Sequence, residues 1–385
     1  MRSIQRAILC VCLLTGGAIC SLAQSNNGGR VNLFMRTDSS WDQFSNNLNP
    51  YVGQWLNQNF WRMQVSAPYF DSRLGWYPNA WAYQDLYGQW SGTSLQWEHP
   101  DWVLRDGNGT PLYVPWGCWG SGCPNMAFDP GNRDFQQWWI NNAKQVLSHG
   151  YKGLWIDDVN MEFRVSYGDG SNALPWNPRT NAPMTYEEWK TAIADFTQQI
   201  RWQLPNAEIV HNSIWFAGGG QRDYDWNVIR EIQSANYINC ERGISDDGLT
   251  SGDGDWSVNA FLRFVDHVHS LGSHVIFDEY GFNGEYGIAG YFLINDGKDG
   301  FGNHQVAPFY TAAEYYVDLG DPRGPRYQWN GMLRRDFTNG SVLVNPARGN
   351  WASGNVGYSA VNIYGSWSQD VWLNPGQGLI IKTSQ

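Results

Sequence analysis

From residue 31 onward, short runs of β-branched and aromatic residues that end in polar residues alternate with longer segments of helical periodicity. Six of the short runs predict buried strands, and a seventh is weaker: 31–35, 61–65, 154–156, 209–211, 237–240, 275–277 and, less clearly, 102–105. Amphipathic helices are predicted between them at 134–147, 185–204 and 261–271, and the second opens with a Thr185–Glu188 capping box. This alternation is typical of repeated βα units.

About seven strands over roughly 290 residues favour a closed barrel over an open sheet. The G-x-G-x-x-G turn that often marks the first crossover of an open nucleotide-binding sheet is absent from the sequence. After about residue 325 the pattern changes to short strands, and Asn339-Gly340 between 332–337 and 341–345 is a strong hairpin signal. We therefore predict a (β/α)8 TIM barrel over residues 24–324, followed by a small antiparallel β domain over residues 325–385.

The first 23 residues are typical of an export signal. Arg2 and Arg6 precede a mostly apolar stretch at 7–20, and Ser21-Leu22-Ala23 forms a small-residue cleavage site. The apolar stretch is too short for a membrane span, which needs about 20 apolar residues, and no later segment approaches that length. We expect a mature chain that begins at Gln24, is secreted or periplasmic, and has no membrane span.

Composition narrows the range of partners. Charged residues make up 16% of the chain, against about 25% in an ordinary soluble domain, and the formal net charge is -11 without a long Lys/Arg run. Nucleic acid is therefore an unsuitable partner, because its binding depends on clustered positive charge. The 23 Trp and 20 Tyr residues are too numerous to be explained by the core alone, and we expect many of them in half-exposed grooves. The oligomeric state stays open.

The cysteines point to an oxidising compartment. Three of the six leave with the signal, and Cys118 and Cys123 flank a Gly/Ser-rich segment, so we expect them to form a disulfide and Cys240 to remain a buried thiol. A metal site would need more ligands at tight spacing, and the sequence holds neither a pair of CxxC motifs nor HExxH. The segment from Asp296 to Asn303 suggests calcium but departs from EF-hand spacing. We predict no metal site and no cofactor.

Carboxylates follow three of the predicted strands, at the end of a barrel strand where reactive groups lie. They are Asp157 and Asp158, Glu241, and Asp278 and Glu279. Structural roles compete with catalysis at each position: Asp158 as a cap, Glu241 as a partner of Arg242, and the last two as braces of a neighbouring loop.

Hydrolysis of a glycosidic bond requires a proton donor and an opposed carboxylate. If 154–156 is the fourth strand and 237–240 the sixth, Asp157 and Glu241 face each other across the barrel axis.

Three stretches, GLWIDDVN, NCERG and DLGDPRGPRYQWNGMLRRDFTNGSVLVNP, resemble a glycosyl-hydrolase-like family of secreted bacterial barrels. They are more distantly similar to the α-1,4-polygalactosaminidases of glycoside hydrolase family 114. In that family an Asp followed by Asn-Val closes the fourth strand and a Glu closes the sixth, and the two are the catalytic pair. The resemblance implies catalytic roles for Asp157 and Glu241, with Asp158 in place of the Asn.

Aromatic residues crowd the segment 76–119 without helical spacing, and Trp76 and Trp116 are our candidates for a sugar platform. A flat ring offers a face to the C–H side of a sugar while polar neighbours bind its hydroxyls. Packing of long loops against the barrel is the alternative. The polar residues that we expect to contact substrate lie at strand ends: Arg36, Asp158, His211, Asn212, Asn239, Asp278 and Glu279.

These observations predict a glycoside hydrolase that acts on an oligo- or polysaccharide. Asp157 would be the nucleophile and Glu241 the general acid/base of a retaining mechanism. A non-catalytic carbohydrate-binding barrel is the alternative from another class, and it would not need the two carboxylates to be opposed. A transglycosylase would use the same pair and differ in how well the site excludes water.

Overall fold

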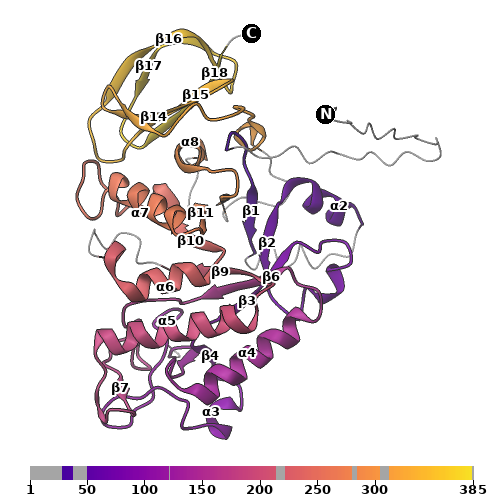
Figure 1. The fold of residues 1–385 in the computed structure, drawn as a ribbon, viewed down its shortest axis with the longest axis vertical. Coiled ribbons are helices and arrows are strands. Elements are labelled where there is room, and N and C mark those ends of the chain that lie inside the picture. The colour runs from indigo at the N-terminus through magenta and orange to yellow at the C-terminus, as the bar shows by residue number, and fades with distance from the viewer. Residues whose placement is uncertain are drawn as a thin grey trace, which may run out of the picture.

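The computed structural model describes residues 28–37, 50–120, 122–213, 222–279, 284–303 and 312–383, so the predicted signal lies outside the described residues. Eight parallel strands close into a barrel in the order β1-β12-β11-β10-β9-β6-β3-β2 (Figure 1). Their bounds are β1 Leu33–Arg36, β2 Arg62–Val65, β3 Ala80–Asp85, β6 Gly153–Asp157, β9 Glu208–Asn212, β10 Tyr237–Arg242, β11 His274–Glu279 and β12 Gly300–Asn303. The predicted barrel is confirmed, and β6 and β10 are its fourth and sixth strands.

Helices pack on the outside of the barrel (Figure 1). They are α2 Pro50–Asn59, α4 Arg133–Leu147, α5 Tyr186–Gln203, α6 Trp226–Ser234, α7 Val258–Ser270 and α8 Gly284–Ile294, with short 3-10 turns η1 Asp71–Arg73, η2 Arg222–Tyr224, η3 Gly243–Ser245 and η4 Ala313–Tyr316. The predicted capping box opens α5: the Glu188 amide donates to the Thr185 hydroxyl at 3.2 Å, and the Thr185 amide donates to the Glu188 carboxylate at 2.8 Å. None of the helices within the described ranges is both long enough and apolar enough to cross a membrane.

Two barrel strands were missed by the sequence reasoning, and the weak strand at 102–105 was wrong. Residues 102–105 lie in an insertion between β3 and α4, where Val103 and Arg105 form only isolated antiparallel bridges. The eighth strand, β12, lacks the apolar pattern of a strand because two of its four residues are glycines. A Cβ at Gly302 would lie 2.8 Å from the Phe34 ring, so the close approach of β1 requires glycine there.

Alternation along the strands divides the barrel interior into two layers. Six buried apolar side chains from six different strands fill the lower layer as a separate cluster, the barrel plug: Phe34, Trp81, Trp155, Val210, Tyr237 and Ile276. Two residues further along the same strands, and so on the same face, lie the polar side chains of the upper layer: Arg36, Tyr83, Asp157, Asn212, Asn239 and Asp278. The plug is therefore the floor beneath the polar end of the barrel.

The insertion between β3 and α4 carries a small hairpin. It contains α3 Leu95–Glu98, and β4 Gly88–Trp90 pairs with β5 Asn125–Ala127. Cys118 and Cys123 are joined by a disulfide within it, while Cys240 on β10 is free and buried, so both cysteine predictions are confirmed. A second short hairpin, β7 Trp176–Asn177 with β8 Ala182–Pro183, precedes α5.

A six-stranded antiparallel sheet follows the barrel, as predicted, in the order β13-β14-β15-β18-β16-β17. Its strands are β13 Tyr327–Trp329, β14 Met332–Phe337, β15 Gly340–Asn345, β16 Ala352–Asn362, β17 Trp367–Leu373 and β18 Gln377–Thr383. The sheet packs on α8 (Figure 1), where the Ile380 amide donates to Glu285 at 3.0 Å. Arg335 of β14 donates to the carbonyls of Phe292 and Asn295, at 2.9 Å each, and so ties the sheet to the end of α8.

The disulfide generates a direct prediction for the chain from Gln24 onward. After unfolding without reductant, a maleimide should label one thiol, Cys240, and after reduction it should label three. Folded protein should resist labelling, because burial hides the Cys240 thiol and raises its pKa. Intact-mass spectrometry counts the labels, with Cys240→Ser as the control that should lose the single adduct. Three labels without reductant would contradict the pairing.

Candidate active site

A cleft of about 470 Å³ opens at the carboxyl ends of the barrel strands. Its walls combine strand-end residues with side chains from the connecting loops: Arg36, Trp116, Asp157, Asp158, Asn160, Arg164, Asn212, Glu241, Arg242, Asp246 and Trp256. Both predicted catalytic carboxylates therefore line one cavity.

Asp157, the last residue of β6, is held by three donors. Its Oδ1 accepts hydrogen bonds from the Asn212 amide at 2.9 Å and from the backbone N–H of Asp158 at 2.9 Å. Its Oδ2 accepts from the Tyr83 hydroxyl, also at 2.9 Å. Hydrogen bonds of this kind favour the charged form of a carboxylate and fix its orientation.

Glu241 of β10 shares a donor with Asp157. Nδ2 of Asn212 donates to Glu241 Oε2 at 3.1 Å as well as to Asp157 Oδ1. The two carboxylate oxygens are thus no more than about 6 Å apart, the sum of the two distances, and about 5 Å apart if each takes one of the two amide hydrogens. Glu241 Oε1 also lies 3.4 Å from the guanidinium of Arg36.

The orientation of the Asn212 amide is set by a neighbour in the same polar layer. Asn239, its register partner on the neighbouring strand, donates to Asn212 Oδ1 at 2.9 Å, which directs the Asn212 Nδ2 toward the carboxylates. Asn239 Nδ2 in turn lies 3.5 Å from Asp278 Oδ2. Asp278 is fully buried and accepts from Arg36 at 3.2 Å, so this chain of contacts ends on an ion pair.

Arg36 thus contacts both Asp278 and Glu241 from β1. Its guanidinium lies 5.0 Å from the ring centroid of Trp155, which belongs to the barrel plug. A positive charge over the face of an indole is an attractive arrangement. Asp278 does not itself line the cleft; it holds the arginine that does.

Asp158 forms the wall beside Asp157 and adopts a left-handed backbone with φ of 55°. Its Oδ1 accepts from Trp116 Nε1 and from Asn160 Nδ2, both at 2.9 Å. Asp158 also interacts with the buried carboxyl of Asp85, the residue opposite Asp157 in the register of β3 and β6. Three carboxyl groups therefore lie close together at the ends of β3 and β6.

Burial and neighbouring charge raise the pKa values of both Asp158 and Asp85. Burial, followed by the charge of Asp157, raises the pKa of Asp158 from 3.8 to about 7. Burial and the charge of Asp158 likewise raise the pKa of Asp85 well above its ordinary range. Asp158 therefore changes charge near neutral pH, and it does so in contact with the aromatic wall of the cleft.

Three predicted substrate contacts lie away from the cleft. Trp76 precedes β3 and packs on α2, where a Cβ at Gly53 would lie 2.7 Å from its ring. His211 is fully buried and pairs with Glu231 of α6 at 2.7 Å, because the residue before Asn212 faces outward from the barrel. Glu279 accepts from the backbone amides of Ile244 and Ser245, and burial raises its pKa to about 8. These three side chains support the frame of the site.

Other residues in or beside the cleft were not predicted as site residues. Tyr83 and Asp85 belong to β3, which reads as a loop when its Trp and Tyr are counted among the aromatics of the insertion; the alternation Trp81-Ala82-Tyr83 was the available signal. Arg164 and Trp256 come from loops far apart in the sequence, and no local pattern marks them.

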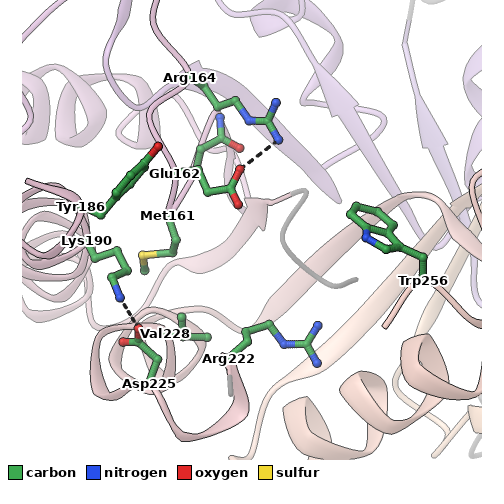
Figure 2. A pocket seen from close by; sticks show the side chains of 10 residues that line it. Met161, Glu162, Arg164, Tyr186, Lys190, Arg222, Asp225, Val228 and Trp256 are labelled. Carbon is green, nitrogen blue, oxygen red and sulfur yellow. Dashed lines mark hydrogen bonds and ion pairs between the residues drawn. The ribbon is translucent and has the colours of Figure 1, made fainter. Parts of the chain in front are cut away.

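A second pocket of about 480 Å³ adjoins the cleft and shares Asn160, Arg164 and Trp256 with it. Figure 2 shows Tyr186 and Lys190 on one side of this pocket and Trp256 on the other. Its charged residues are paired: Lys190 with Asp225, and Arg164 with Glu162 at 3.4 Å. The three shared lining residues place the second pocket directly beside the catalytic cleft.

Residues 62–341 match the model of hypothetical glycosyl hydrolase family 15. The chain belongs to this family. The match confirms the resemblance to glycosyl hydrolases and identifies the chain as a glycoside hydrolase by family. No curated protein sequence matches it.

Three solved structures are similar to this glycosyl hydrolase at low identity, and the first of them shares its fold. The noncanonic maltogenic α-amylase AmyB of Thermotoga neapolitana is 12% identical with a TM-score of 0.50, over 92% of this chain and 99% of that one. The glycoside hydrolase domain of PelA from Pseudomonas aeruginosa is 13% identical with a TM-score of 0.43, over 75% and 97%. The α-galactosidase TtGalA of Thermus thermophilus is 15% identical with a TM-score of 0.47, over 80% and 65%.

The raised pKa of Asp158 predicts that the stability difference between Asp158→Asn and the wild type depends on pH. The pKa of Asp158 rises on folding from 3.8 to about 7, so the wild type loses stability as the pH increases through that window. Asn at this position can still accept from Trp116 and Asn160 and can donate to Asp85. The melting temperature of the variant relative to wild type should therefore increase from pH 4 to about pH 7 and then level off.

Differential scanning fluorimetry between pH 4 and pH 9 measures this difference. Asp253→Asn, at a carboxylate whose side chain is 79% exposed, is the control for a general effect of removing one negative charge. A difference that is the same for Asp158→Asn at pH 4 and at pH 8 would contradict the raised pKa of Asp158.

Proposed function

We propose that the protein is a secreted retaining glycoside hydrolase that acts on an oligo- or polysaccharide, with Asp157 as nucleophile and Glu241 as general acid/base. The observation that carries the proposal is the single amide nitrogen of Asn212 between the two carboxylates. Retaining enzymes hold their carboxyl groups about 5 to 5.5 Å apart, whereas inverting enzymes leave about 6.5 to 9.5 Å for a water. An oxygen separation of about 5 Å, and no more than about 6 Å, supports the retaining class.

The contacts of the two carboxylates suit different roles. Asp157 accepts from Asn212, Tyr83 and the Asp158 amide, and these contacts fix it in the orientation of a nucleophile that attacks the anomeric carbon. Glu241 accepts from Asn212 and lies 3.4 Å from Arg36, which also pairs with Asp278. In the first step Glu241 gives its proton to the leaving oxygen as Asp157 bonds to the sugar; in the second it takes a proton from the water that releases the sugar.

The surrounding residues supply recognition. Arg36, Asn212 and Asp158 line the cleft with donors and acceptors for hydroxyl groups, and Trp116, 47% exposed, offers an indole ring at its wall. Asn239 and Asp278 act behind them as positioning residues. The adjoining second pocket supports a substrate of several sugar units, because it lies directly beside the cleft that holds the bond-cleaving residues.

A non-catalytic carbohydrate-binding protein is the competing proposal, and turnover separates the two. The mature protein is incubated with a panel of α- and β-linked polysaccharides, and new reducing ends are measured. If the protein binds at least one polysaccharide of the panel and releases no reducing ends from any of them, the result would favour a non-catalytic binding protein. Transfer products in place of free sugars would favour a transglycosylase.

Secretion is proposed from the first 23 residues and is supported by the disulfide between Cys118 and Cys123. N-terminal sequencing of the protein recovered from its producing cells tests it, and Gln24 is the expected first residue.

Asp157→Asn and Glu241→Gln should each lower kcat by at least about 1,000-fold on the substrate that the screen identifies, because each removes a group that changes bonding in the transition state. Circular dichroism should show an unchanged fold. Asp253→Asn is a matched surface control and should keep the wild-type rate. If either active-site variant retains a near-wild-type rate, the pair is wrong and Asp158 or Asp278 becomes the next candidate.

Trp116→Ala should weaken oligosaccharide binding by about 1 to 2 kcal/mol and leave the melting temperature nearly unchanged, because the ring is half exposed at the cleft. Trp76→Ala should do the reverse: it should lower stability by up to about 3 kcal/mol without affecting binding, because its ring packs on α2. Isothermal titration with the oligosaccharide product and thermal unfolding measure the two effects. Unaltered binding in Trp116→Ala would remove this residue from the site.

A further inference from the structure

Two histidines and two aspartates converge at the end of the barrel opposite the cleft. His269 lies in the last turn of α7 and His274 is the first residue of β11, while Asp296 and Asp299 lie in the loop between α8 and β12. One ligand atom from each of these four side chains lies within 4.8 Å of all the others. Three chain segments that are separate in sequence therefore bring nitrogen and oxygen donors to one point.

The four side chains are fixed by their neighbours. His269 Nε2 lies 2.8 Å from Asp299 Oδ1, and His274 Nδ1 lies 2.9 Å from Asp296 Oδ2. The fully buried Asp299 accepts backbone N–H bonds from Val275 at 2.8 Å and from Asp296 at 3.0 Å. Backbone donors behind a carboxylate are the kind of outer contact that orients metal ligands.

Two ordinary ion pairs do not account for the whole arrangement. His274 Nδ1 is shielded from solvent, and its contact with Asp296 lacks the direction of a hydrogen bond, so this nitrogen has no hydrogen-bond partner among the described residues. A buried ring nitrogen without a hydrogen bond is costly. An ion placed among the four donors would satisfy that nitrogen and neutralise both carboxylates.

We propose that these four side chains form a structural site for a divalent transition metal, with zinc as the best-fitting ion. Two imidazole nitrogens and two carboxylate oxygens are a donor set that zinc accepts in tetrahedral geometry, with bonds of about 2.0 to 2.2 Å and donors therefore about 3.4 Å apart. The two contacting pairs separate by about 0.5 Å to reach that spacing. Calcium and magnesium prefer oxygen donors alone, which disfavours them here.

A metal ion at this position would stabilise the part of the barrel to which the C-terminal sheet is attached. Asp296 directly follows Asn295, whose carbonyl accepts from Arg335 of the C-terminal sheet. The ion joins the turn between α7 and β11 to the loop between α8 and β12, next to this contact. Its removal loosens the barrel where the sheet is attached and leaves the carboxylate pair at the opposite end intact. The inference is thus independent of the proposed hydrolase mechanism.

The experiment uses tag-free mature protein that has been treated with EDTA and desalted, and zinc chloride is the probe. We expect one equivalent of zinc by isothermal titration and by elemental analysis, and a rise of several degrees in the melting temperature at saturating zinc. His274→Ala and Asp296→Asn should each lose the bound equivalent and the rise. His149→Ala removes a similar histidine–carboxylate contact, 2.7 Å from Asp71 on the surface, and should keep both.

Each outcome decides the proposal. Zinc binding below about a tenth of an equivalent, or one equivalent that persists in His274→Ala and Asp296→Asn, overturns it. If those variants do not fold, cobalt(II) is added to the wild type instead: the intense visible absorption of a tetrahedral cobalt site, displaced by one equivalent of zinc, supports the site, and the weak spectrum of hydrated cobalt overturns it.

Discussion

One amide nitrogen lies between the two carboxylates that are our candidates for catalysis, and their separation depends on it. Nδ2 of Asn212 donates to Asp157 on one side and to Glu241 on the other, so the distance between fourth and sixth strands is bridged by a residue of the fifth. This shared donor holds the two carboxyl groups at a fixed separation. Asn239 keeps the amide in the orientation that places its N–H groups toward both.

The polar layer rests on the packing below it. Large apolar side chains fill the lower part of the barrel, and Trp155 and Val210 lie two residues before Asp157 and Asn212. Alternate residues of a strand face the same side. A bulky residue in the plug therefore fixes the position along the barrel axis, and the direction, of the functional residue two positions later. The register of the parallel strands sets lateral neighbours in the same way: Asp85 is opposite Asp157, and Asp278 is opposite Glu241. The high density of carboxyl groups in the cleft therefore follows from strand order.

The electrostatic cost of that density is offset locally. Arg36 neutralises the buried Asp278 and approaches Glu241, while burial and mutual charge raise the pKa values of Asp85 and Asp158. The position of Asp158, where the more distant family has Asn, gives this cleft a group that titrates near pH 7 against the Trp116 ring. The charge at this wall of the cleft therefore depends on pH, because Asp158 titrates there. An Asn at the same position would stay neutral at every pH.

The sequence predicts the barrel and the position of the carboxylate pair because both depend on local patterns. An apolar run that ends in a carboxylate marks β6 and β10. Counting strands along the chain places them fourth and sixth only because the wrong strand at 102–105 takes the place of the missed β3. The failures have physical reasons. Glycines replace the apolar pattern in β12, where Phe34 approaches closely, and His211 faces outward because it is one residue away from Asn212. Arg164 and Trp256 join the cleft through tertiary packing, which periodicity does not report, whereas Asp85 was missed with the rest of β3.

The most direct test of the carboxylate geometry is the anomeric configuration of the first product. Proton NMR, recorded within minutes of adding wild-type enzyme to a substrate of known linkage and before mutarotation, resolves the α and β anomers of the released sugar. A separation of about 5 Å between Asp157 and Glu241 predicts that the new reducing end has the configuration of the bond that was cleaved. A product of inverted configuration would contradict the double displacement through Asp157 and, with it, the role assigned to the Asn212 bridge.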